Sequence, residues 1–233
     1  MNVIPLGGKS LSPVVWDLIL QSTTGVSEFY RSDFFREIES LENLREYADY
    51  KTGSITTATC WSLLSAAYYF QPRIIFEVGT FIGKSTLSLL RGMRLGGPSH
   101  SKIYTCDLSN DIALPFGNAG EVVQFRKQTS TQMLAALCAN DIQCDFLALD
   151  GRLQKDDFKY LEKVLHPNSI ILLDDFEGVE KGVVNATMLM SSLQPSHNLL
   201  YPPERYMLSK FGLVDGCTTA LIVPRIAFAL TNQ

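Results

Sequence analysis

The sequence predicts an α/β protein built on a doubly wound sheet of seven strands, mostly parallel, with helices on both faces. Three observations support this. Between residues 73 and 193, five short apolar runs alternate with helical patterns, as is typical of parallel strands buried on both faces. The first of these runs is followed by a glycine turn, and others end on an acid. Two last apolar runs have no helical pattern between them, which predicts a terminal antiparallel hairpin at the sheet edge.

Residues 1–52 are expected to form a separate helical segment. The stretch 32–50, SDFFREIESLENLREYADY, has a helical pattern whose apolar positions are Phe34, Ile38, Leu41 and Leu44. Ser32 or Asp33 is suited to cap its start. An aromatic stripe runs through the segment at Trp16, Phe29, Tyr30, Phe34 and Phe35. We expect this stripe to pack against the core; the alternatives are a lid over a pocket and a dimer contact.

Residues 53–233 are expected to form the main domain. A helix over 54–70 should end before Gln71-Pro72. The parallel strands expected after it are 73–78, 102–107, 122–126, 145–150 and 169–174. The helices expected between and after them are 85–93, 130–139, 156–166 and 179–193. The runs 197–201 and 218–224 should form the hairpin.

Composition narrows the function classes. The chain has 233 residues, of which 46% are hydrophobic and 19% charged, and its net charge is −4. No basic stretch stands out, which disfavours nucleic acid held through its phosphates. The five cysteines show no C-x-x-C pair, which is typical of reduced thiols. Without a signal-peptide pattern or a membrane-length apolar run, the sequence predicts a soluble, cytoplasmic protein with no membrane partner.

The first predicted strand leads into FEVGTFIGKST, residues 76–86. Its end resembles a phosphate-binding P-loop, but only three residues separate Gly79 from Gly83, where a P-loop needs four. Glu77 would repel a phosphate, whereas a ligand with a cationic amino group would favour a carboxylate there. The alternative is an ordinary strand-to-helix turn with an incidental acid. Lys84 is expected to point into solvent.

Polar residues also follow the second and third predicted strands. Asp107 is placed to accept hydrogen bonds from a ribose diol, and the alternative is a solvated loop acid. Thr129 and Ser130 lie at a predicted helix start, where they either cap the helix or contact an adenine edge. The histidines His100, His166 and His197 are expected at the surface.

Three carboxylates follow the fourth and fifth strands. We expect Asp150, Asp174 and Asp175 to cluster above the centre of the sheet, beside the ligand. Oxygen-only clusters suit a magnesium ion, Mg²⁺, or Mn²⁺ or Ca²⁺. The alternative is that Asp150 holds a cofactor or orients a substrate while Asp174 and Asp175 cap the next loop. Without metal, repulsion would raise the pKa of at least one of them.

Taken together, these motifs resemble the class I S-adenosylmethionine-dependent methyltransferases. FEVGTFIGKST is similar to the family's first motif, YTCD to the second, and DFLALDG and IILLDDF to the motifs of the fourth and fifth strands. The resemblance runs from about Gly53 to the C-terminus and implies a Rossmann-like sheet. The helix over 54–70 before EVGTFIGKST resembles the catechol and caffeoyl-CoA branch. The DG and DD pairs resemble the macrocin and cephalosporin-type small-molecule O-methyltransferases.

The resemblance implies a role for each candidate residue. The turn from Gly79 to Gly83 would hold the methionine part of S-adenosylmethionine, Glu77 its amino group and Asp107 its ribose. The further cofactor-binding candidates are Thr80, Ser85, Thr129, Ser130 and Asp150. The metal candidates are Asp150, Asp174 and Asp175, and without metal Asp150 or Asp175 would be the catalytic base.

The implied reaction is methyl transfer to a small-molecule oxygen, by a protein that we expect to be a homodimer. N-methylation and a cofactor-binding protein with non-methylating chemistry remain alternatives. The glycine spacing disfavours a nucleotide-dependent kinase or an NAD(P) enzyme.

Overall fold

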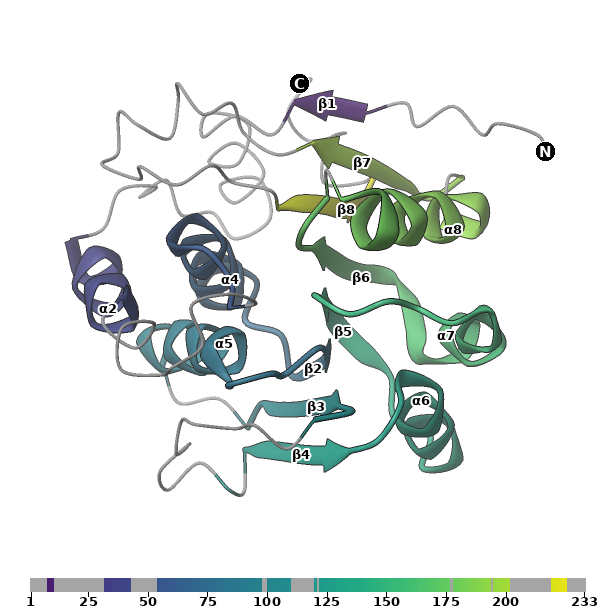
Figure 1. Ribbon diagram of the computed structural model, residues 1–233, viewed down its shortest axis with the longest axis horizontal. Helices are drawn as coiled ribbons and strands as arrows, with labels where there is room; N and C mark the ends of the chain where they lie inside the picture. The colour runs from purple at the N-terminus through teal and green to yellow at the C-terminus, as the bar shows by residue number, and fades with distance from the viewer. Residues whose placement is uncertain are drawn as a thin grey trace.

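An eight-stranded sheet runs through the middle of the protein (Figure 1). The computed structural model describes residues 8–10, 32–42, 54–97, 100–109, 120, 122–176, 178–193, 195–201 and 219–225. The strands are β1 (Gly8–Ser10), β2 (Ile74–Val78), β3 (Lys102–Asp107), β4 (Val123–Lys127), β5 (Cys144–Leu149), β6 (Leu165–Leu173), β7 (His197–Tyr201) and β8 (Ala220–Pro224). Their order across the sheet is β1-β7-β8-β6-β5-β2-β3-β4.

All seven predicted strands are present, and the mostly parallel sheet is confirmed. Strand β8 lies between β6 and β7 and is antiparallel to both, while the other pairs are parallel. The count of seven was one short, because the three-residue strand β1 pairs with β7 at the edge. A stretch as short and polar as Gly-Lys-Ser carries no strand pattern, so only its tertiary pairing defines it.

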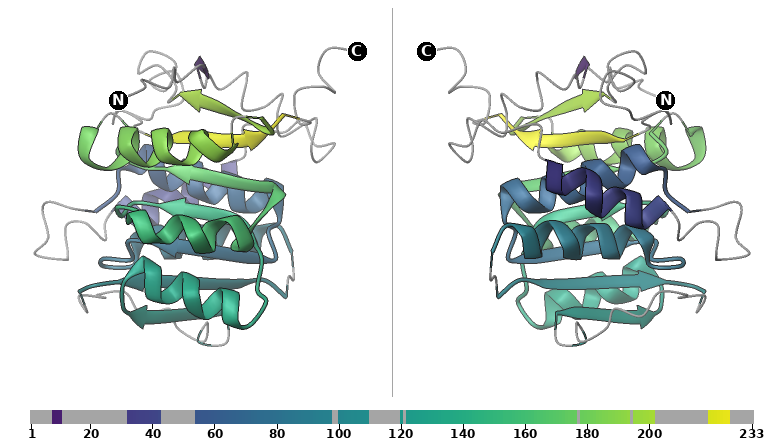
Figure 2. Two further views of the ribbon diagram at one scale, coloured as in Figure 1. Left: turned by 90° about the vertical axis from the view of Figure 1, so that its right-hand side faces the viewer. Right: turned by 90° about the vertical axis from the view of Figure 1, so that its left-hand side faces the viewer.

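Helices cover both faces of the sheet. On one face lie α2 (Ser32–Glu42), α4 (Thr57–Phe70) and α5 (Lys84–Leu95). On the other lie α6 (Ser130–Ala139), α7 (Phe158–Val164) and α8 (Val184–Leu193), as the side views in Figure 2 also show. A 3₁₀ turn, η2 (Lys155–Asp157), precedes α7, and a π-helical turn, η3 (Val179–Val183), leads into α8. Each predicted helix is therefore found within the described residues, with ends shifted by a few residues; the predicted stretch 43–50 lies outside them.

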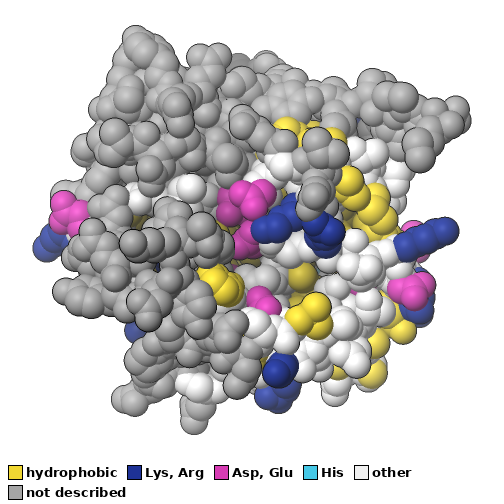
Figure 3. Space-filling view, viewed as in Figure 1, with side chains coloured by type: hydrophobic (Ala, Val, Ile, Leu, Met, Phe, Trp, Pro, Cys, Tyr) yellow, Lys and Arg dark blue, Asp and Glu magenta, His cyan; other side chains and the backbone are white. Residues whose placement is uncertain are grey.

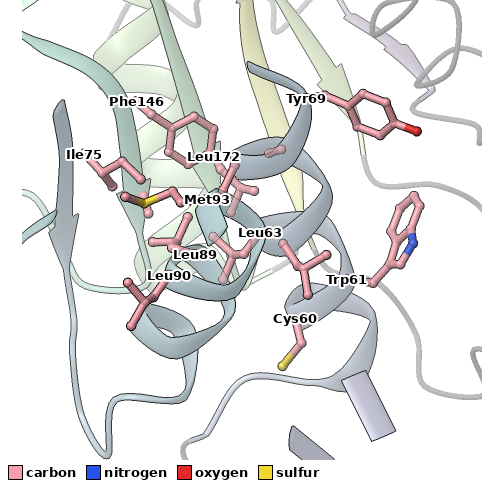
Figure 4. Packing of buried hydrophobic residues seen from close by; sticks show 14 of the residues in the cluster. Cys60, Trp61, Leu63, Tyr69, Ile75, Leu89, Leu90, Met93, Phe146 and Leu172 are labelled. Atoms are coloured by element: carbon pink, nitrogen blue, oxygen red, sulfur yellow. The ribbon is translucent and has the colours of Figure 1, made fainter. Parts of the chain in front are cut away.

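The two faces bury separate hydrophobic clusters. Under α4 and α5, side chains such as Leu63, Leu89 and Phe146 pack together (Figure 4). On the opposite face, the sheet packs against residues of α6, α7 and α8 such as Leu134 and Leu189. Because β2, β5 and β6 contribute to both clusters, these strands are buried on both faces, which explains their continuous apolar sequence.

The predicted helical face of α2 is confirmed where the structure describes it. Phe34, Ile38 and Leu41 are buried, and the Phe34 ring lies edge-on to that of Tyr68, with 5.0 Å between centroids. Phe34 therefore packs against the core, as expected. The predicted residues Trp16, Phe29, Tyr30 and Leu44, and the side chain of Phe35, lie outside the described part. The boundary at residues 52 and 53 and the role as lid or dimer contact stay predictions.

Two expectations about charged or polar side chains were wrong. Lys84 is only 2% exposed, and its Nζ donates to the carbonyl of Ile55 at 3.2 Å, because the start of α5 is covered by the chain entering α4. His197 is also buried, and its Nε2 lies 3.1 Å from the carbonyl oxygen of Ser169. Burial lowers the pKa of the His197 imidazole. Separately, none of the described helices is long and apolar enough to cross a membrane.

Candidate functional site at the carboxyl edge of the sheet

The carboxyl ends of the central strands are joined to one another by backbone hydrogen bonds. The N–H of Gly79, after β2, donates to the carbonyl of Cys106 in β3 at 3.0 Å. The N–H groups of Asp150 and Gly151, after β5, donate to the carbonyl of Val78 at 3.0 and 2.9 Å. The loops that carry the predicted site residues therefore start from one connected edge, as expected for parallel strands.

The glycine turn uses backbone conformations that favour glycine. Gly79 and Gly83 have φ angles of 96° and 91°, and Phe81 between them has φ 45°. Gly83 directly precedes α5 and has no side-chain cap bond there. The turn thus brings left-handed backbone and a helix N-terminus together, an arrangement that can approach a ligand closely.

Glu77 lies under this turn and is 1% exposed. Its Oε2 accepts hydrogen bonds from the hydroxyls of Thr86 and Thr105 at 2.5 Å each, and the Thr105 hydroxyl also lies 2.5 Å from that of Thr80. Burial raises the pKa of the Glu77 carboxyl, and the hydroxyl donors lower it in part.

The second oxygen of Glu77 is what points to a ligand. Oε1 is buried and has no hydrogen-bond partner among the described residues. Glu77 also lines a cavity about as large as one water molecule, together with Ser85, Asp150 and Asp174. A buried acceptor without a donor is costly. A cationic amino group, directly or through a water, would supply the missing donor, so this residue fits the role that the sequence predicts for it.

Asp107 ties the end of β3 to the glycine turn. Its Oδ2 accepts from the N–H of Phe81 and its Oδ1 from that of Ser109, both at 2.8 Å. The half-buried carboxylate is therefore oriented by the backbone, and its oxygens keep further lone pairs for a ribose diol. The sequence did not suggest this second task, in which Asp107 holds Phe81 in its left-handed conformation.

Thr129 and Ser130 start α6. Thr129 is the N-cap and forms a capping box with Gln132, its side chain accepting from the Gln132 N–H at 3.2 Å. The Ser130 hydroxyl donates to Asp157 at 2.7 Å. The cap that we expected for Thr129 is thus present. An adenine contact by either residue stays a prediction.

Replacing Thr129 with alanine should cost about 1 kcal/mol of folding free energy, because the first turn of α6 loses its cap. Thr129→Ser keeps the hydroxyl and should retain most of that stability. Urea denaturation of the two variants measures the difference. Equal stability of Thr129→Ala and the wild type would contradict a capping role.

The predicted carboxylates meet a lysine that the sequence analysis missed. Lys181 Nζ in η3 donates to Asp150 Oδ1 at 3.1 Å and to Asp175 Oδ2 at 2.9 Å. Asp174 is buried, and its Oδ1 accepts from the Thr59 hydroxyl of α4 at 2.8 Å. No motif marks Lys181, which stands in an ordinary helical pattern; only the loop geometry brings it to the strand ends.

The charged groups of this cluster shift one another's pKa values. Burial, reinforced by the neighbouring charge of Asp174, raises the pKa of Asp150 to about 7, although Lys181 opposes the shift. Burial alone would lower the pKa of Lys181, but the charges of Asp150 and Asp175 outweigh it and raise that pKa. Lys181 therefore stays an ammonium ion at neutral pH, and Asp150 titrates in the range suited to a general base.

The arrangement does not fit the predicted metal. Within the described ranges, no group of three His, Cys, Asp or Glu side chains is placed to hold a metal ion. Asp150 and Asp175 direct oxygens at the Lys181 ammonium, and an oxygen of Asp174 is engaged by Thr59. A divalent ion between these carboxylates would have to displace a lysine of like charge.

The geometry defines a Rossmann-like domain whose candidate site lies at the carboxyl edge of its sheet. Residues 76–176, which include the glycine turn, Asp107 and all three carboxylates, match the family model of a methyltransferase domain. The resemblance to methyltransferases predicted from the sequence is thereby confirmed over these residues. No curated protein matches the sequence.

Solved structures share the fold at low sequence identity. The O-methyltransferase TomG from Streptomyces achromogenes, involved in tomaymycin synthesis and in complex with S-adenosylmethionine, is 15% identical with a TM-score of 0.56, over 84% of this chain and 91% of that one. An O-methyltransferase from Bacillus cereus in complex with S-adenosylhomocysteine is 18% identical with a TM-score of 0.54, over 91% and 99%. The S-adenosylhomocysteine-bound Podospora anserina methyltransferase PaMTH1 is 18% identical with a TM-score of 0.52, over 84% and 88%.

Proposed function

We propose that the protein transfers the methyl group of S-adenosylmethionine to an oxygen atom of a small molecule. The observation that carries the proposal is the buried, half-paired carboxylate of Glu77 beneath a glycine turn, with Asp107 at the neighbouring strand end. The methyltransferase family match over the same residues supports it. The solved O-methyltransferases of this fold support oxygen as the acceptor atom.

The cofactor would be held by residues that the sequence predicted. The backbone from Gly79 to Gly83 would contact its methionine part, the Glu77 carboxylate its amino group, and Asp107 its ribose hydroxyls. Thr80 lies within the turn and Ser85 follows it in α5, and both side chains are buried. A hydrogen bond between the charged Asp107 and a hydroxyl is stronger than one between neutral groups, so Asp107 should contribute strongly to affinity.

The cofactor supplies an activated methyl group on a sulfonium sulfur. When it is bound, the acceptor oxygen would form a bond to that methyl group while the electron pair of the sulfur–methyl bond stayed on sulfur. The protein aligns donor and acceptor and accepts the proton of the acceptor hydroxyl. Asp150, whose pKa is raised to about 7 mainly by burial, is our candidate for this base. Asp175 is the alternative, although it is half exposed.

Asp107→Asn should weaken S-adenosylhomocysteine binding about tenfold or more, because the ribose loses a charged acceptor. Asp141→Asn is the matched control, since it removes an exposed carboxylate that follows α6, at the opposite edge of the sheet, and should bind like the wild type. Isothermal titration calorimetry measures both. Binding of ATP that depends on Lys84, with none of S-adenosylhomocysteine, would disprove the proposed function.

Three further parts of the proposal rest on the sequence. We infer a small-molecule acceptor, a homodimer and a cytoplasmic location. The cysteine pattern supports the last of these, and Cys60, Cys106, Cys138 and Cys144 are free thiols in the described part of the chain. N-methylation remains the alternative within the same fold, and a panel of hydroxyl and amine acceptors separates the two.

A further inference from the structure

The Lys181 ammonium is held between two strand ends. Asp150 follows β5 and Asp175 follows β6, and Lys181 reaches both from the turn η3. Figure 3 shows acidic and basic side chains next to each other near the middle of the face that Figure 1 presents. Two carboxylates at hydrogen-bond distance fix a lysine more firmly than a single surface ion pair does.

The backbone around Lys181 fixes the ammonium as well. Asp175 has a left-handed φ of 49°, and its carbonyl accepts from the N–H of Gly178 at 2.8 Å. A Cβ on Gly182 would lie 2.1 Å from Phe176 Cα, so η3 rests directly on the chain leaving β6. Only glycine permits that approach. The turn therefore cannot move away from the strand end without breaking these contacts.

A second link runs to the loop after β5. The Asn185 side chain in α8 accepts from the N–H of Leu153 at 3.0 Å and donates to the carbonyl of Gly151 at 2.9 Å. The helix that follows Lys181 is thus joined to the loop that carries Asp150. Both partners of the ammonium are consequently positioned by main-chain contacts, as an organised site requires.

Asp150, one of the two partners of the ammonium, lies next to the glycine turn. A Cβ placed on Gly79 would lie 3.3 Å from Asp150 Cβ, so Asp150 stands between the turn and Lys181. Lys181 has 36% of its side chain exposed, and two of its three N–H donors serve Asp150 and Asp175 among the residues described here. The third donor has no acceptor among the described residues.

We propose that Lys181 is the resident cation of the acceptor site, occupies the position that a divalent metal would need, and donates a hydrogen bond to the acceptor oxygen. The proposal rests on the proposed function. When the acceptor hydroxyl gives its proton to a base and its oxygen takes the methyl group, the ammonium keeps its own protons and stabilises the negative charge that develops on the oxygen.

A lysine also implies a class of acceptor. A divalent ion has several coordination positions and can chelate two neighbouring oxygens, whereas an ammonium is a single point charge that favours one. The geometry therefore points to an acceptor with one acidic hydroxyl, such as a phenol or an enol, and to no requirement for a vicinal diol.

Mn²⁺ binding tests whether Lys181 occupies the metal position, and the measurement does not depend on methyl transfer. The wild type should bind Mn²⁺ weakly, followed by the electron paramagnetic resonance signal of the free ion. Lys181→Met removes the charge between the carboxylates and should gain Mn²⁺ affinity about tenfold or more. Lys159→Met is the matched control, because Lys159 is an exposed lysine paired with Asp156. Tight Mn²⁺ binding by the wild type, or no gain in Lys181→Met, would overturn the proposal.

Kinetics test the acceptor contact. With simple phenols as acceptors, Lys181→Met should lower kcat/KM about a hundredfold while the KM for S-adenosylmethionine changes little, and Lys181→Arg should restore part of the loss. Turnover by the wild type should persist after thorough chelation with EDTA. Loss of turnover on chelation, restored by Mg²⁺, would contradict a resident lysine and leave the proposed methyl transfer intact. Failure to bind S-adenosylhomocysteine would instead disprove the proposed function itself.

Discussion

Replacing Gly79 with alanine is expected to destabilise the protein, lowering its free energy of unfolding by about 2–3 kcal/mol. The same change should weaken S-adenosylhomocysteine binding about tenfold or more. Gly79 has a φ of 96°, which L residues with a side chain rarely adopt. Its added Cβ would lie 2.9 Å from the backbone nitrogen of Gly151 and 3.0 Å from the carbonyl carbon of Asp150. Both contacts are backbone, so two loops of the site must shift together.

Gly97→Ala separates the clash from the backbone strain. Gly97 also has a left-handed φ, 116°, but a Cβ there would meet no atom of the described residues within 4 Å. Gly97→Ala should therefore lower the free energy of unfolding by only about 1 kcal/mol and leave S-adenosylhomocysteine binding unchanged. Urea denaturation and calorimetry compare the two variants. If both glycines give the same loss of stability, contact between the β2 and β5 loops is not what requires glycine at residue 79.

The fold was predictable because strands that are buried on both faces of a sheet have continuously apolar sequences. Strands β2, β5 and β6 are continuous apolar runs since one side packs under α4 and α5 and the other under the opposite helices. Strand β1 has no such sequence. Among the described strands it pairs only with β7. Its three residues have no strong strand propensity, so the sequence alone could not reveal it.

The site was predictable where topology decides it. Parallel strands bring their carboxyl ends to one edge, so Glu77, Asp107 and Asp150 could be placed together from strand order alone. Contacts that depend on loop geometry could not. Lys181 comes to Asp150 through a π-helical turn, and Lys84 turns inward to the Ile55 carbonyl. Nothing in the local sequence around either lysine indicates where its side chain will point.

Asp150 connects the parts of the site. Its backbone N–H binds β2, its Cβ adjoins the glycine turn, and its carboxylate faces Lys181. The buried Asp174 adds a second negative charge, which raises the pKa of Asp150 further after burial itself. Asp150 therefore contacts both the glycine turn and Lys181. Its charge state should affect the free energy of unfolding.

Asp150→Asn is expected to be more stable than the wild type above pH 7 and about equally stable below pH 4. The carboxyl has a pKa of about 7 when folded, against an ordinary value of 3.8. Between these values the unfolded chain binds fewer protons than the folded one, so the wild type loses stability as pH rises. A shift of this size corresponds to about 2–4 kcal/mol at pH 8.

Asparagine resembles the protonated acid, so the variant lacks this pH-dependent loss. Urea unfolding at pH 4 and pH 8, with EDTA present, measures the two stabilities. Asp156→Asn serves as the control because its exposed carboxylate should give the same small difference at both pH values. A wild type that gains stability relative to Asp150→Asn between pH 4 and pH 8 would show that Lys181 outweighs burial and Asp174. In that case Lys181 would hold Asp150 ionised, and under the proposed function a base other than Asp150 would have to take the acceptor's proton.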